Sequence, residues 1–251
     1  MVFQIQLANQ VVEIHSLCRE VWNLTKEYRL MPEDQVMPSF SCEMSDEDIL
    51  KELHEVRCVN ERSNCRMPLI VGESYLECIA VYRKIAEKMP FFDTFLMHGA
   101  VVGLDGKAYM FAAPSGVGKT TRTVLWMKEY PESVVVNGDK PLVRITKNEA
   151  IAYGTPWCGK EGWNTNISLP LQAVFFVERG ELGSKSTIQE LNFTEAFPSL
   201  MKQTHRPDDP QAVMKTLELV KALDGRVHFY RLCGAPVPET VRIAYEAASP
   251  M

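Results

Sequence analysis

The sequence lacks most of the features that would place a chain of 251 residues in a specialised class of protein. Its seven cysteines include no C-x-x-C pair and are odd in number, so neither a disulfide framework nor a common zinc motif is indicated. The formal net charge of −5 argues against a broad basic surface for nucleic acid. No apolar run approaches the ~18–20 residues of a membrane span, and no signal-peptide pattern is visible. We therefore expect a cytoplasmic protein without a membrane or nucleic-acid partner.

The composition is that of a globular protein, with 46% hydrophobic and 24% charged residues. No internal repeat, low-complexity tract or clear linker divides the chain. His54, Cys58 and Cys65 lie close together in sequence, but their spacing fits no familiar zinc pattern. We expect these and the other cysteines to be reduced thiols.

The segment from Ala113 to Thr120 matches the pattern G-x-x-x-x-G-K-[ST], except that alanine replaces the first glycine. An apolar run over residues 108–113 precedes it, and a helix-compatible stretch over residues 120–130 follows. Glycines let backbone N–H groups approach a polyphosphate, and the helix turns its positive dipole end toward the anion. The pattern predicts a nucleotide-binding loop formed by Pro114, Ser115, Gly116, Val117, Gly118, Lys119, Thr120 and Thr121.

Two residues of this loop have specific expected roles. Lys119 would contact the β- and γ-phosphates of ATP, and the Thr120 hydroxyl would ligate Mg²⁺. Ala113 departs from the pattern, because the first turn of such loops often needs a positive φ. Downstream, residues 133–139, with three consecutive valines, predict a buried strand ending in Asp139, where such proteins hold Mg²⁺. The alternative is that Asp139 only belongs to an Asn-Gly-Asp turn.

The remaining elements follow from hydrophobic periodicity and turn signals. Asp105-Gly106 between two apolar runs is typical of a β-hairpin, which would give the strand before the loop an antiparallel neighbour. Residues 154–166, with three glycines and two tryptophans, predict either a ligand-binding loop or a rigid surface loop. Other expected elements are hairpins over residues 2–14 and 142–153, a short helix or strand from Ser45, helices over 73–89, 193–203, 209–223 and 238–247, and strands over 171–178 and 226–232.

From about Phe95 to its end, the chain resembles the catalytic domain of HPr kinase/phosphorylase and its relatives, which share a P-loop fold with phosphoenolpyruvate carboxykinase. The resemblance rests on His98-Gly99, on the Ser-Gly-Val-Gly-Lys-Thr core of the loop and on the strand ending at Asp139. Residues 153–162 are similar to a set of stand-alone bacterial HPr-kinase-like proteins. The first ninety residues do not resemble the regulatory domain of the authentic enzymes.

This resemblance implies an α/β P-loop core over residues 95–251, with a mixed central sheet flanked by helices. Residues 1–94 are expected to add strands and a helix that extend the same sheet and cap its substrate side. They form either a separate N-terminal part or part of the same domain. The resemblance also implies phosphorylation of a serine hydroxyl with ATP and Mg²⁺. Family members form hexamers, so a homo-oligomer is a further expectation.

The resemblance assigns roles to individual residues. His98 would lie near the phosphates and the catalytic acid, with Lys119 and Asp139 completing the centre. Arg206 resembles the arginine that neutralises charge on the transferring phosphoryl group. Glu161 would supplement the magnesium site, and Lys160 would contact phosphate or an acidic substrate. The alternatives are a core histidine bonded to backbone for His98 and a solvated helix-end arginine for Arg206.

One departure from the family pattern bears on activity. The family's strand ends in two consecutive acids, one of them the proposed general base, whereas here Gly138 precedes Asp139. We expect a kinase that transfers the γ-phosphoryl group of ATP to a serine of a small protein or peptide. The alternatives are a small-molecule kinase on the same fold and a nucleotide-binding regulator with degraded catalysis. GTP and pyrophosphate are alternative donors.

Overall fold

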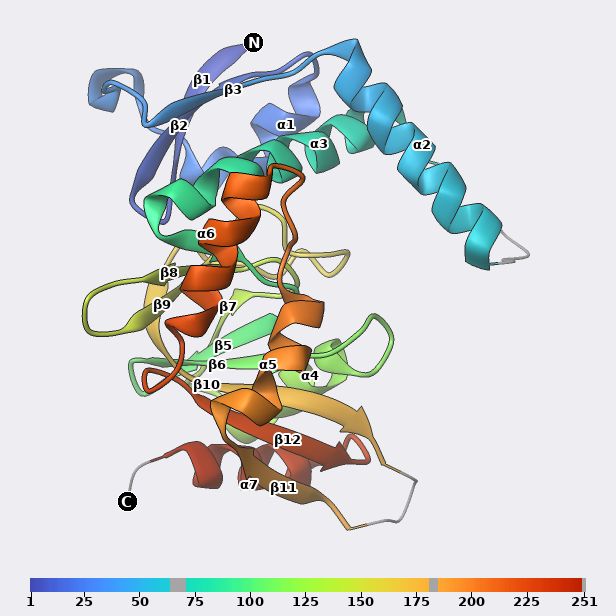
Figure 1. Ribbon diagram of the computed structural model, residues 1–251, viewed down its shortest axis with the longest axis vertical. Coiled ribbons are helices and arrows are strands. Elements are labelled where there is room, and N and C mark those ends of the chain that lie inside the picture. Colours follow the sequence, from blue (N-terminus) through green and yellow to red (C-terminus); the bar gives the residue numbers. More distant parts are fainter. Residues whose placement is uncertain (64–70, 181–184, 250–251) are drawn as a thin grey trace. The chain divides into compact units, whose positions relative to one another are not determined.

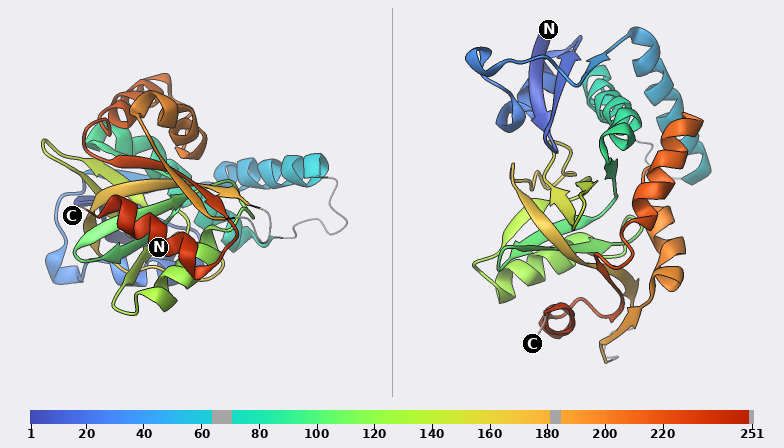
Figure 2. Two further views of the ribbon diagram at one scale, coloured as in Figure 1. Left: turned by 90° about the horizontal axis from the view of Figure 1, so that it is seen from below. Right: turned by 60° about the vertical axis from the view of Figure 1, so that its left-hand side comes forward.

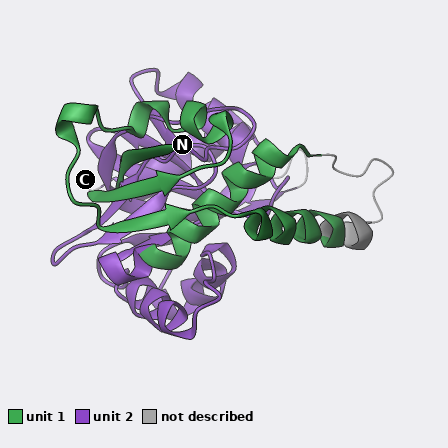
Figure 3. Cartoon of the chain, turned by 90° about the horizontal axis from the view of Figure 1, so that it is seen from above, with its two compact units in different colours: residues 1–88 green, residues 89–251 purple. Residues whose placement is uncertain are grey.

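A computed structural model of the chain describes residues 1–63, 71–180 and 185–249 and divides it into two compact units, residues 1–88 and 89–251 (Figure 3). Within the described ranges, no helix combines the length and apolar character that a membrane crossing requires. His54 Nε2 lies 3.5 Å from Cys58 Sγ, and Cys65 falls outside the described residues. No cluster of three or more potential metal-binding His, Cys, Asp or Glu side chains occurs in these ranges.

The first unit contains its own three-stranded sheet. Strand β1 (Val2–Leu7) pairs antiparallel with β2 (Gln10–His15), and β3 (Phe40–Glu43) pairs parallel with β2. The hairpin turn has positive φ angles at Ala8 and Asn9, as a tight two-residue turn requires. The expectation that these strands extend the sheet of the core was wrong, because the two sheets share no strand in the described part of the chain. Alternating residues predict which face of a strand is buried, but not which sheet it joins.

Helices and short 3₁₀ turns complete the first unit. They are α1 (Arg19–Leu24), the short 3₁₀ turns η1 (Lys26–Tyr28) and η2 (Pro32–Asp34), α2 (Asp46–Ser63) and α3 (Glu73–Lys88). Helix α2 starts after Ser45 as predicted, and Ser45 and Asp48 exchange capping hydrogen bonds. It continues to Ser63, well beyond the short element expected there.

The second unit is built on a nine-stranded mixed sheet flanked by helices, as predicted (Figure 1). Its strand order is β4-β8-β9-β10-β6-β5-β7, and β12 pairs with β10 and β11 with β12. The strands are β4 (Thr94–Leu96), β5 (Ala100–Leu104), β6 (Lys107–Ala112), β7 (Val134–Asn137), β8 (Leu142–Ile145), β9 (Ala150–Tyr153), β10 (Ser168–Arg179), β11 (Thr187–Leu191) and β12 (His228–Gly234). The helices are η3 (Met89–Phe92), α4 (Lys119–Glu129), α5 (Phe193–Gln203), α6 (Pro210–Lys221) and α7 (Pro238–Ala248).

Two hydrophobic cores lie on opposite faces of this sheet, because successive side chains of a strand point to opposite sides. Along β6, Met110 and Ala112 join the core beneath α5 and α6, whereas Tyr109 and Phe111 join the core beneath α4 and α7. Figure 2 shows these two helix pairs on either side of the strands. Trp126 of α4 is fully buried against the rings of Tyr109 and Phe111, which fixes α4 on the sheet.

The strand directions bring several chain ends to one edge of the sheet. Strands β6, β10 and β12 are parallel, so their carboxyl ends meet. Strand β5 runs against β6, and β7 runs against β5, so β5 begins and β7 ends at that same place. We call this place the carboxyl edge. In open α/β sheets, ligands bind beyond the carboxyl ends of the parallel strands, and β6, β10 and β12 form the parallel part of this mixed sheet.

Candidate functional site

The loop between β6 and α4, residues 113–118, connects a buried strand to a helix as predicted, and we call it the glycine loop. Gly116 and Gly118 adopt positive φ angles of 78° and 115°, and α4 begins at Lys119 with no side chain capping its N-terminus. Ala113 is not among the residues with positive φ, so the alanine at the first glycine position introduces no strain of that kind. The uncapped N–H groups at the start of α4 adjoin the loop, which suits an anion.

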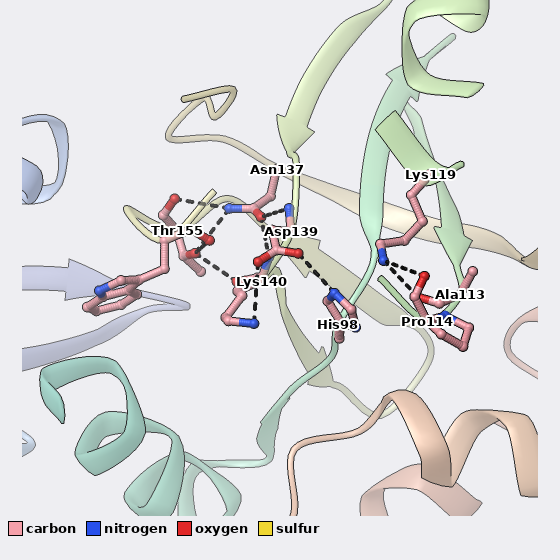
Figure 4. A network of polar contacts seen from close by, with 9 residues as sticks. His98, Ala113, Pro114, Lys119, Asn137, Asp139, Lys140 and Thr155 are labelled. Atoms are coloured by element: carbon pink, nitrogen blue, oxygen red, sulfur yellow. Dashed lines mark hydrogen bonds and ion pairs between the residues drawn. The ribbon is translucent and has the colours of Figure 1, made fainter. Parts of the chain in front are cut away.

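Lys119, the first residue of α4, turns its charged side chain back toward this loop. Its side chain is only 7% exposed, and Nζ donates a 2.7 Å hydrogen bond to the Ala113 carbonyl oxygen (Figure 4). Burial lowers the pKa of the Lys119 ammonium group, and the Asp139 carboxylate partly offsets this effect. A buried ammonium group with carbonyl partners is electrostatically costly, and an anion in the loop would reduce that cost.

A second buried cation ties the loop to the neighbouring strands. Arg122 of α4 is 1% exposed and donates 2.8 Å and 3.4 Å hydrogen bonds to the carbonyl oxygens of Gly234 and Glu178. Its other terminal nitrogen lies 3.5 Å from the Gly118 carbonyl oxygen. A Cβ atom at Gly118 would lie 2.9 Å from that nitrogen, and the φ of 115° at this position also favours glycine. Arg122 therefore fastens the glycine loop to the ends of β10 and β12.

Arg179, the last residue of β10, contacts the loop from outside. Its guanidinium group donates a hydrogen bond to the carbonyl oxygen of Gly116, at the exposed tip of the loop. The β6–β10 register pairs Ala112 with Phe176, so Arg179 extends past the end of β6 alongside the loop. The residue patterns gave no sign of this contact.

On the other side of the loop, a histidine and an aspartate form a pair. Nε2 of His98 lies 3.0 Å from Oδ1 of Asp139, and Nζ of Lys140 lies 3.3 Å from Oδ2 (Figure 4). Burial raises the pKa of the Asp139 carboxyl group, but the hydrogen bond from His98 and the charge of Lys140 outweigh it, so the pKa is lowered. Asp139 is thus ionised at neutral pH and oriented by two neighbours.

The turn that presents Asp139 is fixed by Asn137, the last residue of β7. The fully buried Asn137 side chain accepts hydrogen bonds from the backbone N–H groups of Asp139 and Lys140, at 2.9 Å and 2.7 Å. Its amide nitrogen donates 3.0 Å hydrogen bonds to the carbonyl and hydroxyl oxygens of Thr155. The Thr155 hydroxyl in turn donates to the Lys140 carbonyl oxygen at 2.7 Å. Asn137 and Thr155 therefore hold the acid in place, and neither role was predicted from the sequence.

Backbone ties bring His98 to the same location. The His98 N–H group donates to the Gln203 carbonyl oxygen at 2.7 Å, and the Gly99 N–H group donates to the Asp139 carbonyl oxygen at 3.0 Å. The His98 side chain is therefore not an isolated core histidine, because it pairs with a carboxylate at the carboxyl edge.

Gly138 lies where the loop of residues 154–166 crosses β7. Its N–H group donates a 2.8 Å hydrogen bond to the Trp163 carbonyl oxygen, and a Cβ atom would lie 2.7 Å from the Cys158 carbonyl oxygen. Because backbone atoms cannot give way easily, only glycine fits this position. The lack of a second acid before Asp139 is thus coupled to the close approach of this loop.

The same loop brings a second carboxylate toward Asp139. A Cβ atom at Gly159 would lie 3.2 Å from Asp139 Cβ and 3.6 Å from Glu161 Oε2, so both acids border one small space. The charges of Asp139 and Glu161 both act to raise the pKa of the Cys158 thiol, after burial, which is the larger cause. Carboxylate oxygens are ligands of the type that Mg²⁺ takes alongside phosphate oxygens. Lys160, next to Glu161, is exposed.

Part of this loop also lines a cavity. Its volume is about 510 Å³, and it lies between α4 and residues 162–165. The lining side chains are mainly apolar, and they include the charged Lys128. The cavity is compatible with both predictions for residues 154–166, a ligand-binding loop and a rigid surface loop.

Arg206 lies beyond the end of α5 and is exposed. The segment before it pairs with the chain around His98, through the bridge between Met97 and Thr204 and the hydrogen bond from the His205 N–H group to the Leu96 carbonyl oxygen. Arg206 also lines a cavity of about 390 Å³ between α5 and α6. This pairing is antiparallel and sets Gln203, not Arg206, opposite His98, so the structure does not bring the backbone of Arg206 to the histidine.

Comparisons with known proteins leave the family of this chain unassigned. No protein-family model matches it, and no curated protein matches it. Among solved structures, the chain has a weak similarity to the Hpr(Ser) kinase/phosphatase from Coxiella burnetii, with a TM-score of 0.29 and 10% sequence identity over 49% of this chain and 86% of that one.

Proposed function

We propose that the second unit is an ATP- and Mg²⁺-dependent phosphotransferase that transfers the γ-phosphoryl group to a hydroxyl group, with a serine of a small protein or peptide as the acceptor. The observation that carries the proposal is the position of the His98–Asp139 pair beside a glycine loop that the buried Lys119 side chain contacts. Phosphoryl transfer requires mainly positioning and charge neutralisation. The carboxyl edge gathers groups suited to both tasks.

The donor would bind with its phosphates in the glycine loop. The N–H groups of the loop and of the start of α4 would cradle the β- and γ-phosphates, and Lys119 would exchange its carbonyl partner for phosphate oxygens. Asp139, Glu161 and the Thr120 hydroxyl would hold Mg²⁺ together with those oxygens. The ion would screen the charge that the γ-phosphoryl group carries during transfer.

The proton of the acceptor hydroxyl would pass to His98. A carboxylate with a lowered pKa is a weak base, and Gly138 has no room for a second acid. His98 is bonded to Asp139, which orients its ring in the way that carboxylates orient catalytic histidines. A base positioned in this way contributes typically ~10²–10⁴-fold to rate. Arg206 would have to reach the acceptor with its exposed side chain, because its backbone runs away from His98.

Two measurements on one preparation test the proposal. Calorimetry with Mg·ATP should give saturable binding, and ADP release should rise when a library of serine-containing peptides is added. Lys119→Ala should abolish binding, and Asp139→Asn should abolish transfer while the fold persists. Radioactive γ-phosphate should appear in peptide and not only in free phosphate.

Other outcomes would change the conclusion in defined ways. A chain that does not bind Mg·ATP would overturn the phosphate-binding assignment of the glycine loop, on which the proposal rests. Binding without transfer to any acceptor would favour a nucleotide-binding regulator, the alternative to which Gly138 first pointed. Transfer that needs an added metabolite, and not a peptide, would identify a small-molecule kinase.

A further inference from the structure

We propose that Arg179 binds the β-phosphate of the donor and neutralises the nucleoside diphosphate that leaves during transfer. The inference deepens the proposed function, since it concerns the same nucleotide site. It adds a residue that neither the loop motif nor the position of Arg206 indicates. Its starting point is the contact between the Arg179 guanidinium group and the Gly116 carbonyl oxygen.

Strand order places the charged groups on two separate flanks of the loop. The loop follows β6, with β5 and β7 on one side and β10 and β12 on the other. His98 precedes β5 and Asp139 follows β7, so both lie on the first flank. Arg179 ends β10 and lies on the second. Neighbouring strands are about 4.8 Å apart, so both flanks are within reach of a phosphate chain in the loop.

The direction of transfer decides which phosphate each flank meets. The γ-phosphoryl group must face the acceptor and the base, so it points toward His98 and Asp139. The phosphates nearer the nucleoside then point away from that pair, toward β10. During transfer, the acceptor oxygen bonds to the γ-phosphorus and the bond to the bridging oxygen breaks. The electron pair of that bond remains on the diphosphate, and the acceptor proton passes to His98. The charge that develops on the diphosphate thus appears beside Arg179.

Arg179 is better suited to bind a ligand than to hold the loop in place. Arg122 already fastens the loop to β10 and β12 from the buried side, through three backbone carbonyl groups. Arg179 is exposed, and exposed hydrogen bonds and ion pairs contribute little to stability. Its guanidinium group carries five N–H donors in a planar fork that matches phosphate oxygens. Lys119 likewise contacts a carbonyl oxygen of the loop.

The test compares ligands that differ in their phosphates. Arg179→Gln should weaken binding of Mg·ADP and of inorganic pyrophosphate by about 10–100-fold, as expected for charge-assisted hydrogen bonds. The affinity for AMP should change by less than about 2-fold, because a single phosphate lacks the group that Arg179 meets. Arg179→Lys should retain part of the affinity.

Arg231→Gln is the matched control. Arg231 is a neighbouring arginine on β12 that pairs with Glu178 rather than with the loop, so its loss should leave ADP affinity unchanged. A second control is the melting temperature of Arg179→Gln, which should stay within about 2 °C of the native value.

Three results would overturn the inference. They are unchanged ADP affinity in Arg179→Gln, an equal loss of AMP and ADP affinity, and a fall in melting temperature that accompanies the loss. A native chain that binds neither ADP nor pyrophosphate would overturn the proposed function together with this inference. A native chain that binds both ligands, with an unaffected Arg179→Gln variant, would overturn the inference alone.

Discussion

Nε2 of His98 and Oδ1 of Asp139 lie 3.0 Å apart, and the pair joins the residue before β5 to the turn after β7. The pair has a consequence for stability as a function of pH. The lowered pKa of Asp139 means that its carboxylate is favoured in the folded state. The contribution of the ionised Asp139 to folding stability is therefore complete above its unfolded-state pKa near 4. It is lost as the pH falls through its folded-state pKa.

The first prediction compares native protein with Asp139→Asn over this range. At pH 6 the native chain should have the larger free energy of unfolding. The difference between the two proteins should shrink steadily between about pH 5 and pH 3. Urea unfolding at several pH values measures the difference. The His228–Glu190 pair is exposed, so Glu190→Gln serves as a control in which little or no such change is expected. An advantage that grows on acidification would contradict the ionised, hydrogen-bonded carboxylate.

For Lys119 we predict the opposite effect: its charged form lowers the stability of the folded protein, whereas that of Asp139 raises it. Its ammonium group has a lowered pKa because it is buried, so the charged form costs the folded state free energy below the folded-state pKa. Lys119→Met should therefore be as stable as the native chain or more stable at pH 7, and this difference should narrow as the pH rises toward 10. Nucleotide binding should nevertheless be lost. Thermal unfolding and calorimetry on the same variant separate the two effects, and a strongly destabilised variant would contradict this account.

Arg122→Met is expected to destabilise the protein by roughly 2–4 kcal/mol, because it leaves carbonyl groups at the ends of β10 and β12 without their buried donor. Arg231→Met removes the same charge from a side chain that is 46% exposed and should change stability by less than about 0.5 kcal/mol. Chemical unfolding measures both. Equal effects of the two substitutions would show that Arg122 does not act as a buried anchor.

Gly138→Ala tests the close approach of the loop to β7. The new Cβ atom would meet the Cys158 carbonyl oxygen at 2.7 Å, so we expect a loss of about 1–3 kcal/mol in unfolding free energy. Gly138→Asp should lose at least as much and should gain no activity from its added carboxylate. A Cβ atom added at Gly72 would have no atom of the described residues within 4 Å, so Gly72→Ala is the control and should be tolerated. A stable and more active Gly138→Asp variant would refute the steric explanation.

Local features of the second unit were predicted well from the sequence. The Asp-Gly turn at residues 105–106 has the positive φ angles of a tight hairpin and joins two antiparallel strands. The strand before the glycine loop and the helix after it also occur as expected. These features depend on adjacent residues, whose turn chemistry and hydrophobic pattern are visible in one short window.

Features that depend on contacts between distant segments were not predictable in this way. Asn137 looked like a turn residue, yet its side chain forms the hydrogen bonds that orient Asp139. Arg179 reaches the loop only because β10 pairs with β6 in a particular register. The separate N-terminal sheet was missed for the same reason, since strand partners are chosen by the whole fold.

The two flanks of the glycine loop differ in sequence separation: His98 and Asp139 lie close to the loop along the chain, whereas Arg179 lies far from it. His98, the loop and Asp139 come from the single stretch 98–139, in which β5 pairs with both β6 and β7. The arginine flank instead requires β10 and β12 to arrive from much later in the sequence. A chain emerging from the ribosome would therefore have β5, β6 and β7 available for pairing first, and the contacts from Thr155 and Gln203 that hold Asp139 and His98 would follow. It would acquire Arg179 only when β10 had paired with β6.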